Sequence, residues 1–126
     1  MTKKIIVAKT LSPPVGPFSQ GVRDGDFIFV SGQVAQDPRT GKVVEGGVDR
    51  QTEQVLHNLG EVLSAAGKSF SDVVRVGVYL TNMAEFSAMN AVYAKHFKEP
   101  YPARTTIAVA ALPLGAAVEM DLVVKD

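Results

Sequence analysis

The chain has 126 residues, of which 46% are hydrophobic and 21% charged, and 13 basic residues balance 13 acidic ones. This composition is typical of one soluble globular domain spanning residues 1–126 and excludes a disordered chain. A net charge of zero provides no general attraction to nucleic acid or to an anionic membrane, so we expect neither as a partner.

The absence of cysteine excludes disulfides, thiolate metal sites and cysteine nucleophiles, and it is compatible with a cytoplasmic protein. No apolar stretch is long enough to span a bilayer, and the N-terminal segment lacks the apolar run of a secretory signal. His57 and His96 lie far apart in the sequence, which argues against a histidine-based metal site. We therefore expect a cytoplasmic protein that holds no metal.

The first half of the chain predicts two strands and a helix. Residues 3–8 indicate a short strand, and residues 11–21 indicate a loop rich in proline and glycine. The β-branched and aromatic residues between positions 26 and 35 predict a buried strand. Apolar residues recur at helical spacing over residues 48–66, and Gly67 is placed to follow the end of that helix.

The second half predicts three strands and one helix. Residues 73–80 are apolar almost throughout, as expected of a central strand. Asn82 begins a capping pattern for a second helix. Residues 104–112 and 117–125 indicate two strands joined by a short connection. One face of the second helix is expected to carry Phe86, Met89, Asn90, Tyr93 and Phe97.

This order of elements predicts an α+β fold with one mixed sheet and two helices on one face. The first helix joins two strands by a crossover, so part of the sheet is expected to be parallel. Over residues 105–110, neither face of the expected strand has the charged side chains of a face that is open to water. A sheet that is apolar on both faces favours an oligomer over a monomer.

Arg104 is the first candidate for chemistry, because a permanently charged side chain begins an apolar strand. Its planar guanidinium group suits a carboxylate. An ion pair at the surface and a site for a small anionic ligand are both compatible with this position. The flanking prolines and the apolar continuation favour burial of the aliphatic part of the side chain.

Glu119 is the second candidate, because it lies among apolar residues on the same strand side as Asp121. It is either a structural ion-pair partner or a base that orients water. If the last two strands formed a hairpin closing at residues 112–116, Glu119 and Arg104 would lie about 16 Å apart. Their cooperation would then require a ligand and water between them, a different register or a neighbouring subunit.

Asn90 and Gly32 have two interpretations each. Asn90 interrupts the apolar face of the second helix, where its amide bonds either a loop carbonyl or a ligand. Ser31 and Gly32 end a buried strand, where the glycine either marks a bulge or lets a ligand approach the backbone.

Phosphate-binding loops, zinc-protease motifs and catalytic triads are absent from the sequence.

Taken together, these residues resemble the RidA family of reactive-intermediate deaminases. The elements SGQ, N-x-x-Y, P-A-R-[ST] and L-P-x-x-x-x-x-E are weak signals singly, but their joint order and spacing are specific. The similar segments cover nearly the whole chain, at residues 16–22, 29–44, 51–67, 73–97 and 102–121.

The resemblance implies a chorismate-mutase-like fold in a homotrimer, with three sheets forming a central β-barrel and active sites between subunits. It also implies the hydrolysis of enamines and imines, such as 2-iminopropanoate and 2-iminobutanoate, to 2-oxo acids and ammonia. The expected partners are therefore small imino and 2-oxo acids, and the resemblance implies no cofactor or metal.

By position, the resemblance implies that Arg104 binds the substrate carboxylate and that Glu119 orients water. It places Ser31, Gly32 and Asn90 in the same site. Two further site positions depart from the family: Phe18 stands where tyrosine is common, and Thr106 stands where cysteine is frequent. These departures keep open a binding or regulatory trimer without turnover. A role attached to some relatives keeps open a second alternative, an RNA-cleaving inhibitor of translation. The neutral charge weighs against the RNA-cleaving alternative.

Overall fold

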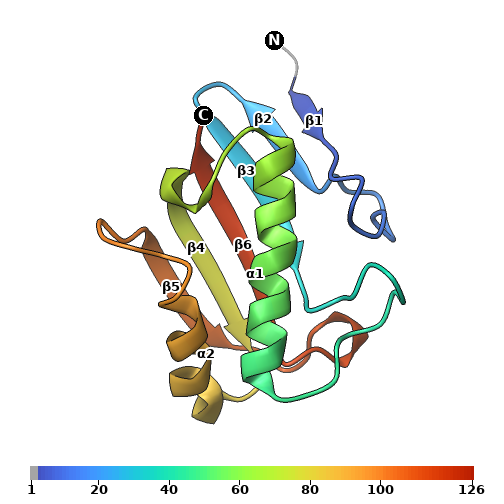
Figure 1. Cartoon of the computed structure of the whole chain (residues 1–126), viewed down its shortest axis with the longest axis vertical. Coiled ribbons are helices and arrows are strands. Elements are labelled where there is room, and N and C mark those ends of the chain that lie inside the picture. The colour runs from blue at the N-terminus through green and yellow to red at the C-terminus, as the bar shows by residue number, and fades with distance from the viewer. Residues whose placement is uncertain (1–2) are drawn as a thin grey trace.

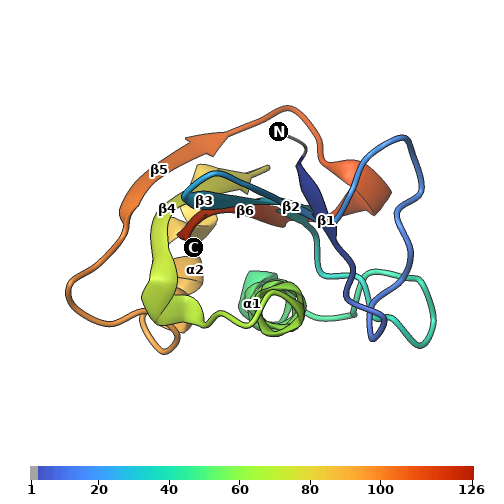
Figure 2. The same ribbon diagram turned by 90° about the horizontal axis from the view of Figure 1, so that it is seen from above.

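One mixed sheet and two α-helices make up the fold, as the sequence predicted. The computed structural model describes residues 3–126, and within them both helices lie on the same face of the sheet (Figures 1 and 2). The helices are α1 (Val48–Ala65) and α2 (Phe86–Tyr93). The strands are β1 (Lys4–Ile6), β2 (Gly21–Asp24), β3 (Phe27–Gln33), β4 (Val73–Leu80), β5 (Ala103–Ala108) and β6 (Val118–Lys125).

The strand order is β1-β2-β3-β6-β4-β5, and only the β4/β5 pair is parallel within the described residues. The predicted parallel part of the sheet therefore exists, but α2 makes its crossover. The first helix α1 connects β3 to β4, which lie on either side of β6. Short 3₁₀ turns precede β4, α2 and β6, at Phe70–Asp72, Met83–Glu85 and Pro113–Gly115.

The hairpin register considered for the last two strands is wrong. β6 lies between β3 and β4, whereas β5 ends at Ala108 and forms the sheet edge beyond β4. The physical reason is burial: every second residue of β6 is buried beneath the helices, so this strand requires neighbours on both sides. The buried residues of β6 are Val118, Met120, Leu122 and Val124.

Two other boundaries differ from the sequence predictions. The strands expected over residues 3–8 and 26–35 are shorter, because β1 and β3 end at Ile6 and Gln33. The strand β2 was not predicted, since its four residues are too few to show alternation. Gly25, with φ of +62°, makes the turn that joins β2 to β3.

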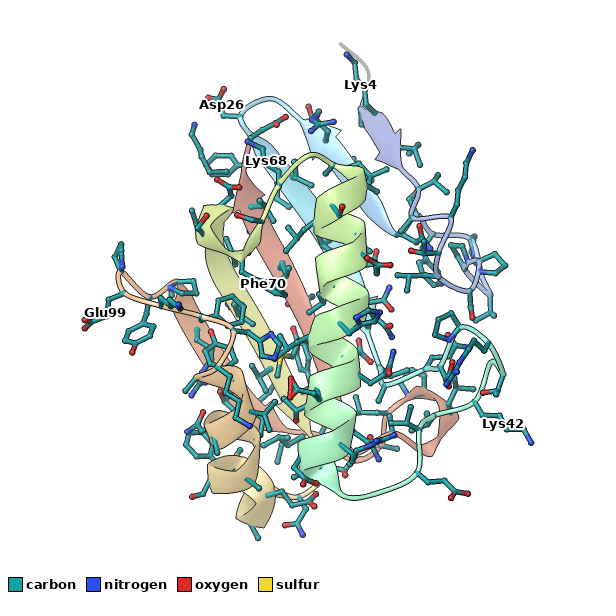
Figure 3. All side chains as sticks on the ribbon, in the orientation of Figure 1. Lys4, Asp26, Lys42, Lys68, Phe70 and Glu99 are labelled. Atoms are coloured by element: carbon teal, nitrogen blue, oxygen red, sulfur yellow. The ribbon has the colours of Figure 1, made fainter. Side chains whose placement is uncertain are left out.

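The core lies between the helices and the covered face of the sheet. Val55, Leu56 and Leu59 of α1 are fully buried against it, and α1 crosses the sheet diagonally in Figure 1. Gly67, with φ of +74°, follows the helix end as predicted. Phe70, labelled in Figure 3, packs at the margin of this core. None of the helices within residues 3–126 has the length and apolar character that a membrane span requires.

Within residues 3–126, neither α-helix lies on the other face of the sheet (Figure 2). Strand pairing places Ile5, Phe29 and Ile107 on this open face, opposite to the buried residues of the same strands. These side chains and Phe27 are between 40 and 53% exposed. The open face therefore carries exposed apolar side chains, as expected from the sequence, but Glu119 and Asp121 of β6 lie on it as well.

Candidate functional site

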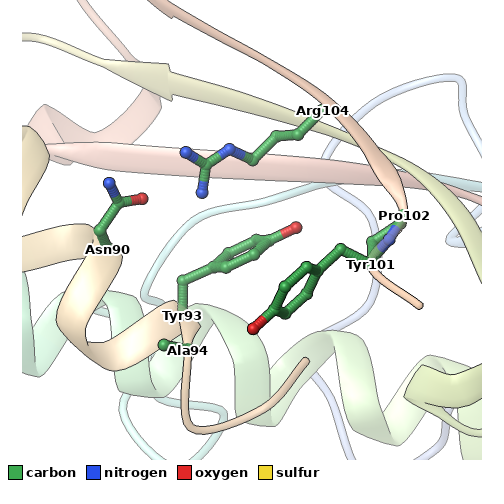
Figure 4. Close-up of a pocket in the computed structure, with 6 residues that line it drawn as sticks. All are labelled: Asn90, Tyr93, Ala94, Tyr101, Pro102 and Arg104. Atoms are coloured by element: carbon green, nitrogen blue, oxygen red, sulfur yellow. The ribbon is translucent and has the colours of Figure 1, made fainter. Parts of the chain in front are cut away.

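Arg104 lies on the helix-covered side of the edge strand β5. It pairs with the buried Val76 of β4, and its guanidinium carbon lies 4.6 Å from the centre of the Tyr93 ring and 5.6 Å from that of Phe86. Figure 4 shows the guanidinium of Arg104 beside the Tyr93 ring. Aromatic faces attract this cation and hold it in place. Among residues 3–126, none of the salt bridges involves Arg104. The sequence left a surface ion pair open, and this geometry argues against it.

The guanidinium of Arg104 borders a cavity of about 310 Å³ between α2, β5 and the segment that joins them (Figure 4). Its walls are mostly aromatic or aliphatic, so it provides one fixed positive charge inside an apolar pocket. This arrangement suits a small carboxylate that carries an apolar group. The lining residues are Asn90, Tyr93, Ala94, Tyr101, Pro102 and Arg104.

Tyr93 and Tyr101 are site residues that the sequence reasoning missed. Tyr93 is stacked on Phe97 with ring centres 4.4 Å apart. This stacking holds in place the ring that contacts the guanidinium of Arg104. Burial raises the pKa of Tyr93, and the positive charge of Arg104 opposes that rise. The three-residue spacing from Asn90 to Tyr93 is a signal that could have found this residue, because such pairs share a helix face.

Glu119 lies on the open face, in the strand β6 next to β3. Its carboxylate rests against Gly32, where a Cβ atom would lie only 2.0 Å from Oε2 of Glu119. The register shift between Val30 and Gln33 confirms the bulge that was one reading of this glycine. Burial raises the pKa of Glu119, and the negative charge of Asp121 raises it further. Such a carboxylate is a stronger proton acceptor than an exposed one.

A loop carrying Phe18 is fixed beside the same end of β3. The hydroxyl of Ser31 donates a hydrogen bond of 2.6 Å to the carbonyl of Ser19, and the Ser31 amide donates one of 3.0 Å to the carbonyl of Gln20. Phe18 itself is 50% exposed. Ser31, Gly32 and Glu119 therefore lie together, and we call them, with Phe18 of the adjoining loop, the carboxylate half-site.

Arg104, Asn90 and the aromatic cavity form a second group, which we call the arginine half-site. Thr106 follows Arg104 on the same strand face but does not line the cavity. The Thr106 hydroxyl is buried and has no hydrogen-bond partner within residues 3–126. In that same part of the chain, no three histidine, aspartate or glutamate side chains are placed to share a metal ion.

The two half-sites lie on opposite faces of the sheet. Arg104 pairs with Val76 of β4, and Glu119 pairs with Tyr79 of the same strand. Residues three apart in a strand point to opposite faces. A small molecule therefore cannot touch Arg104 and Glu119 of one chain without crossing the sheet.

Gln20 fixes the loop of the carboxylate half-site. Its buried side chain accepts a hydrogen bond of 2.6 Å from the amide of Ala8 and donates weaker ones to the carbonyls of Ala8 and Ser12. We expect Gln20→Ala to lower the free energy of unfolding by about 1–3 kcal/mol, because the buried Ala8 amide loses its partner. Urea denaturation measures this loss. Gln36→Ala removes an exposed amide and should stay within about 0.5 kcal/mol of the parent; equal losses would contradict the prediction.

The comparisons with known proteins identify the family. Residues 9–125 match the family model described as Endoribonuclease L-PSP. The chain belongs to this family. A RutC family protein of Pyrococcus horikoshii is 42% identical over 121 residues, which cover 96% of each chain. The 2-iminobutanoate/2-iminopropanoate deaminase of Bos taurus is 41% identical over 123 residues, which cover 98% of this chain and 90% of the bovine one.

Solved structures of the L-PSP family have the same fold. The crystal structure of RidA from the Antarctic bacterium Psychrobacter sp. superposes with a TM-score of 0.93 at 38% identity, covering 98% of this chain and 99% of that one. The resemblance to the RidA family seen in the sequence is therefore confirmed. The family description and the names of individual members point to different reactions, ribonucleolysis and imine deamination.

Proposed function

We propose that this protein hydrolyses reactive imines and enamines of small amino acids to 2-oxo acids and ammonia. The arginine half-site carries the proposal, because it combines a fixed guanidinium that lacks an acidic partner among residues 3–126 with an apolar cavity of about 310 Å³. Such a site suits 2-iminopropanoate and 2-iminobutanoate, which have a carboxylate beside a short aliphatic group. Relatives at about 40% identity that are named for this reaction support the same conclusion.

Arg104 holds the substrate carboxylate through two parallel charge-assisted hydrogen bonds. Glu119 accepts a proton from a water molecule whose oxygen attacks the carbon of the C=N bond. The nitrogen of the resulting tetrahedral intermediate is protonated and leaves as ammonia, and a 2-oxo acid remains. An imine protonated on nitrogen is already electrophilic, so positioning of substrate and water is the main task of the protein.

We further propose that the active site is shared between two copies in a homotrimer. One subunit supplies Arg104, Asn90 and Thr106, and its neighbour supplies Glu119, Gly32, Ser31 and Phe18. The placement of the two half-sites on opposite sheet faces supports this division. The exposed apolar side chains of the open face support packing of three such sheets into a central barrel, in a chorismate-mutase-like assembly.

Specific observations favour two alternatives to imine deamination. Phe18 lacks the hydroxyl common at its position, and Thr106 lacks a thiol, which favours a trimer that binds 2-oxo acids without turnover. The family description favours ribonuclease activity, whereas the net charge of zero weighs against it.

A coupled assay tests the proposed function. A dehydratase or amino-acid oxidase generates imino acids from several amino acids, and the release of 2-oxo acid is followed with and without this protein. We expect faster release than spontaneous hydrolysis, with short aliphatic substrates preferred. Equal rates together with tight binding of 2-oxo acids would favour the binding trimer, and RNA cleavage by the purified protein would favour the nuclease.

A further inference from the structure

We propose that Asp121, fixed by the hydroxyl of Tyr79, is a positioning residue that strengthens Glu119 as a proton acceptor by repelling its negative charge. This inference deepens the proposed function and depends on it for its catalytic meaning. The electrostatic link between the two carboxylates can be measured without reference to activity.

The geometry places the two carboxylates side by side on the open face. Glu119 and Asp121 are two residues apart in β6, so their side chains leave the sheet on the same side. Tyr79 of β4 pairs with Glu119, yet its hydroxyl donates a hydrogen bond of 2.9 Å to Oδ2 of Asp121. The side chain of Asp121 is therefore fixed in one position next to Glu119.

Glycines provide the space that both carboxylates occupy. A Cβ atom on Gly77, the partner of Asp121 in β4, would lie 2.3 Å from Oδ1 of Asp121 and 2.8 Å from the Tyr79 hydroxyl. Gly32 of β3 leaves the corresponding space for Glu119. Each carboxylate thus fills the space beside a glycine of the neighbouring strand, where partial burial increases the strength of charge interactions.

Within residues 3–126, no other group that faces Glu119 neutralises the negative charges of Glu119 and Asp121. From β6 the charged neighbour is Asp121, and from β4 the titratable groups are Tyr79 and Arg75. The guanidinium of Arg75 donates to the carbonyl of Val76 and to the hydroxyl of Thr105. From β3, residues 31–33 are serine, glycine and glutamine and carry no charge.

The direction of the effect follows from this arrangement. The hydrogen bond to Asp121 raises the pKa of Tyr79, so the phenol remains a donor near neutral pH and holds the Asp121 carboxylate in place. The charge on Asp121 in turn raises the pKa of Glu119, in addition to the larger effect of burial. Removal of the Asp121 charge must therefore move the titration of Glu119 to lower pH.

Carbon-detected NMR of the side-chain carboxyls in the full-length protein measures this titration. The Glu119 resonance is assigned by its absence in Glu119→Gln. We expect Asp121→Asn to shift the midpoint of Glu119 to lower pH, and Tyr79→Phe to shift it less in the same direction, because Asp121 is then no longer held in position beside Glu119. Asp24→Asn removes an exposed carboxylate at the end of β2 and should leave the midpoint unchanged.

The pH dependence of kcat is the second readout. In Asp121→Asn we expect its acidic limb to move with the Glu119 titration, and kcat near neutral pH to fall by less than about tenfold, because the base is weakened and not removed. KM should stay unchanged, since Arg104 holds the substrate carboxylate.

The outcomes separate the two proposals. An unchanged Glu119 midpoint in both variants overturns the role of Asp121, whatever the activity. A shifted midpoint with an unshifted acidic limb also overturns it. A shifted midpoint in a protein without deaminase activity in any form leaves the link between the carboxylates standing and overturns the proposed function. Where Asp121→Asn does not fold, Tyr79→Phe decides.

Discussion

Arg104→Ala is expected to lower kcat/KM for short imino acids by roughly a hundred- to a thousandfold, since removing one partner of a buried charge pair costs about 2–5 kcal/mol. The fold should survive, because β5 is an edge strand and the side chain borders a cavity. Arg104→Lys keeps the charge but loses the planar pair of donors, so its activity should be intermediate. The coupled assay measures the rates, and thermal unfolding checks the fold. Wild-type rates in Arg104→Ala would exclude the arginine half-site as the place where substrate binds.

Mixing of inactive variants tests whether the site is shared. Arg104→Ala and Glu119→Gln subunits, unfolded and refolded together in equal amounts, should regain about a quarter of the wild-type activity, because chance pairing unites two intact half-sites at that frequency. Each variant refolded alone should remain inactive. No recovery in mixtures whose subunits are shown to exchange would contradict the division of the site between neighbouring subunits.

Local patterns predicted the elements well where the periodicity was long. The strand over residues 73–80 agrees with β4 at both ends, and the helix over residues 48–66 differs from α1 by one residue. Both segments have enough apolar residues to show their period clearly. The four residues of β2 do not, and that strand was missed.

Strand pairing could not be predicted from local patterns, because the partners are far apart in sequence. The segment from Arg104 to Glu119 reads as a hairpin, yet β6 lies between β3 and β4, and β5 lies beyond them. This order is set by the burial of one face of β6 and by the crossover of α2. The hairpin register assumed for the two candidate residues was therefore wrong, although a different register and a neighbouring subunit were already among the open alternatives.

The close approach of Glu119 to Gly32 likewise could not be predicted from the sequence. The bulge was one of two readings for this glycine, and the other was contact between its backbone and a ligand. The space where its Cβ would lie is occupied by a carboxylate from a strand that lies far away in the sequence. In the sequence, a glycine that makes room for a side chain of the same protein looks the same as a glycine that makes room for a ligand.

Gly32→Ala should therefore abolish most of the activity without unfolding the protein. The new Cβ would lie 2.0 Å from Oε2 and 2.9 Å from Cδ of Glu119, so the carboxylate must move. Its side chain can rotate away, and Gly32 does not have a positive φ, so the cost in stability is small. A misplacement of about 1 Å of a catalytic group can cost roughly a hundredfold in rate, and we expect at least this loss in kcat.

Gly60→Ala in α1 is the matched control, because the new Cβ would lie 3.5 Å from the Phe70 ring, an ordinary van der Waals distance. It should leave kcat unchanged and stabilise the protein by about 0.5–1 kcal/mol, since alanine restricts the unfolded chain more than glycine does.

A double variant shows whether the loss of activity in Gly32→Ala comes from the displacement of Glu119. If Gly32→Ala acts only by displacing Glu119, it can cause no further loss in a Glu119→Gln background, because the group that it displaces has already lost its function. A further loss there would mean that the backbone around Gly32 contributes to the reaction independently of Glu119.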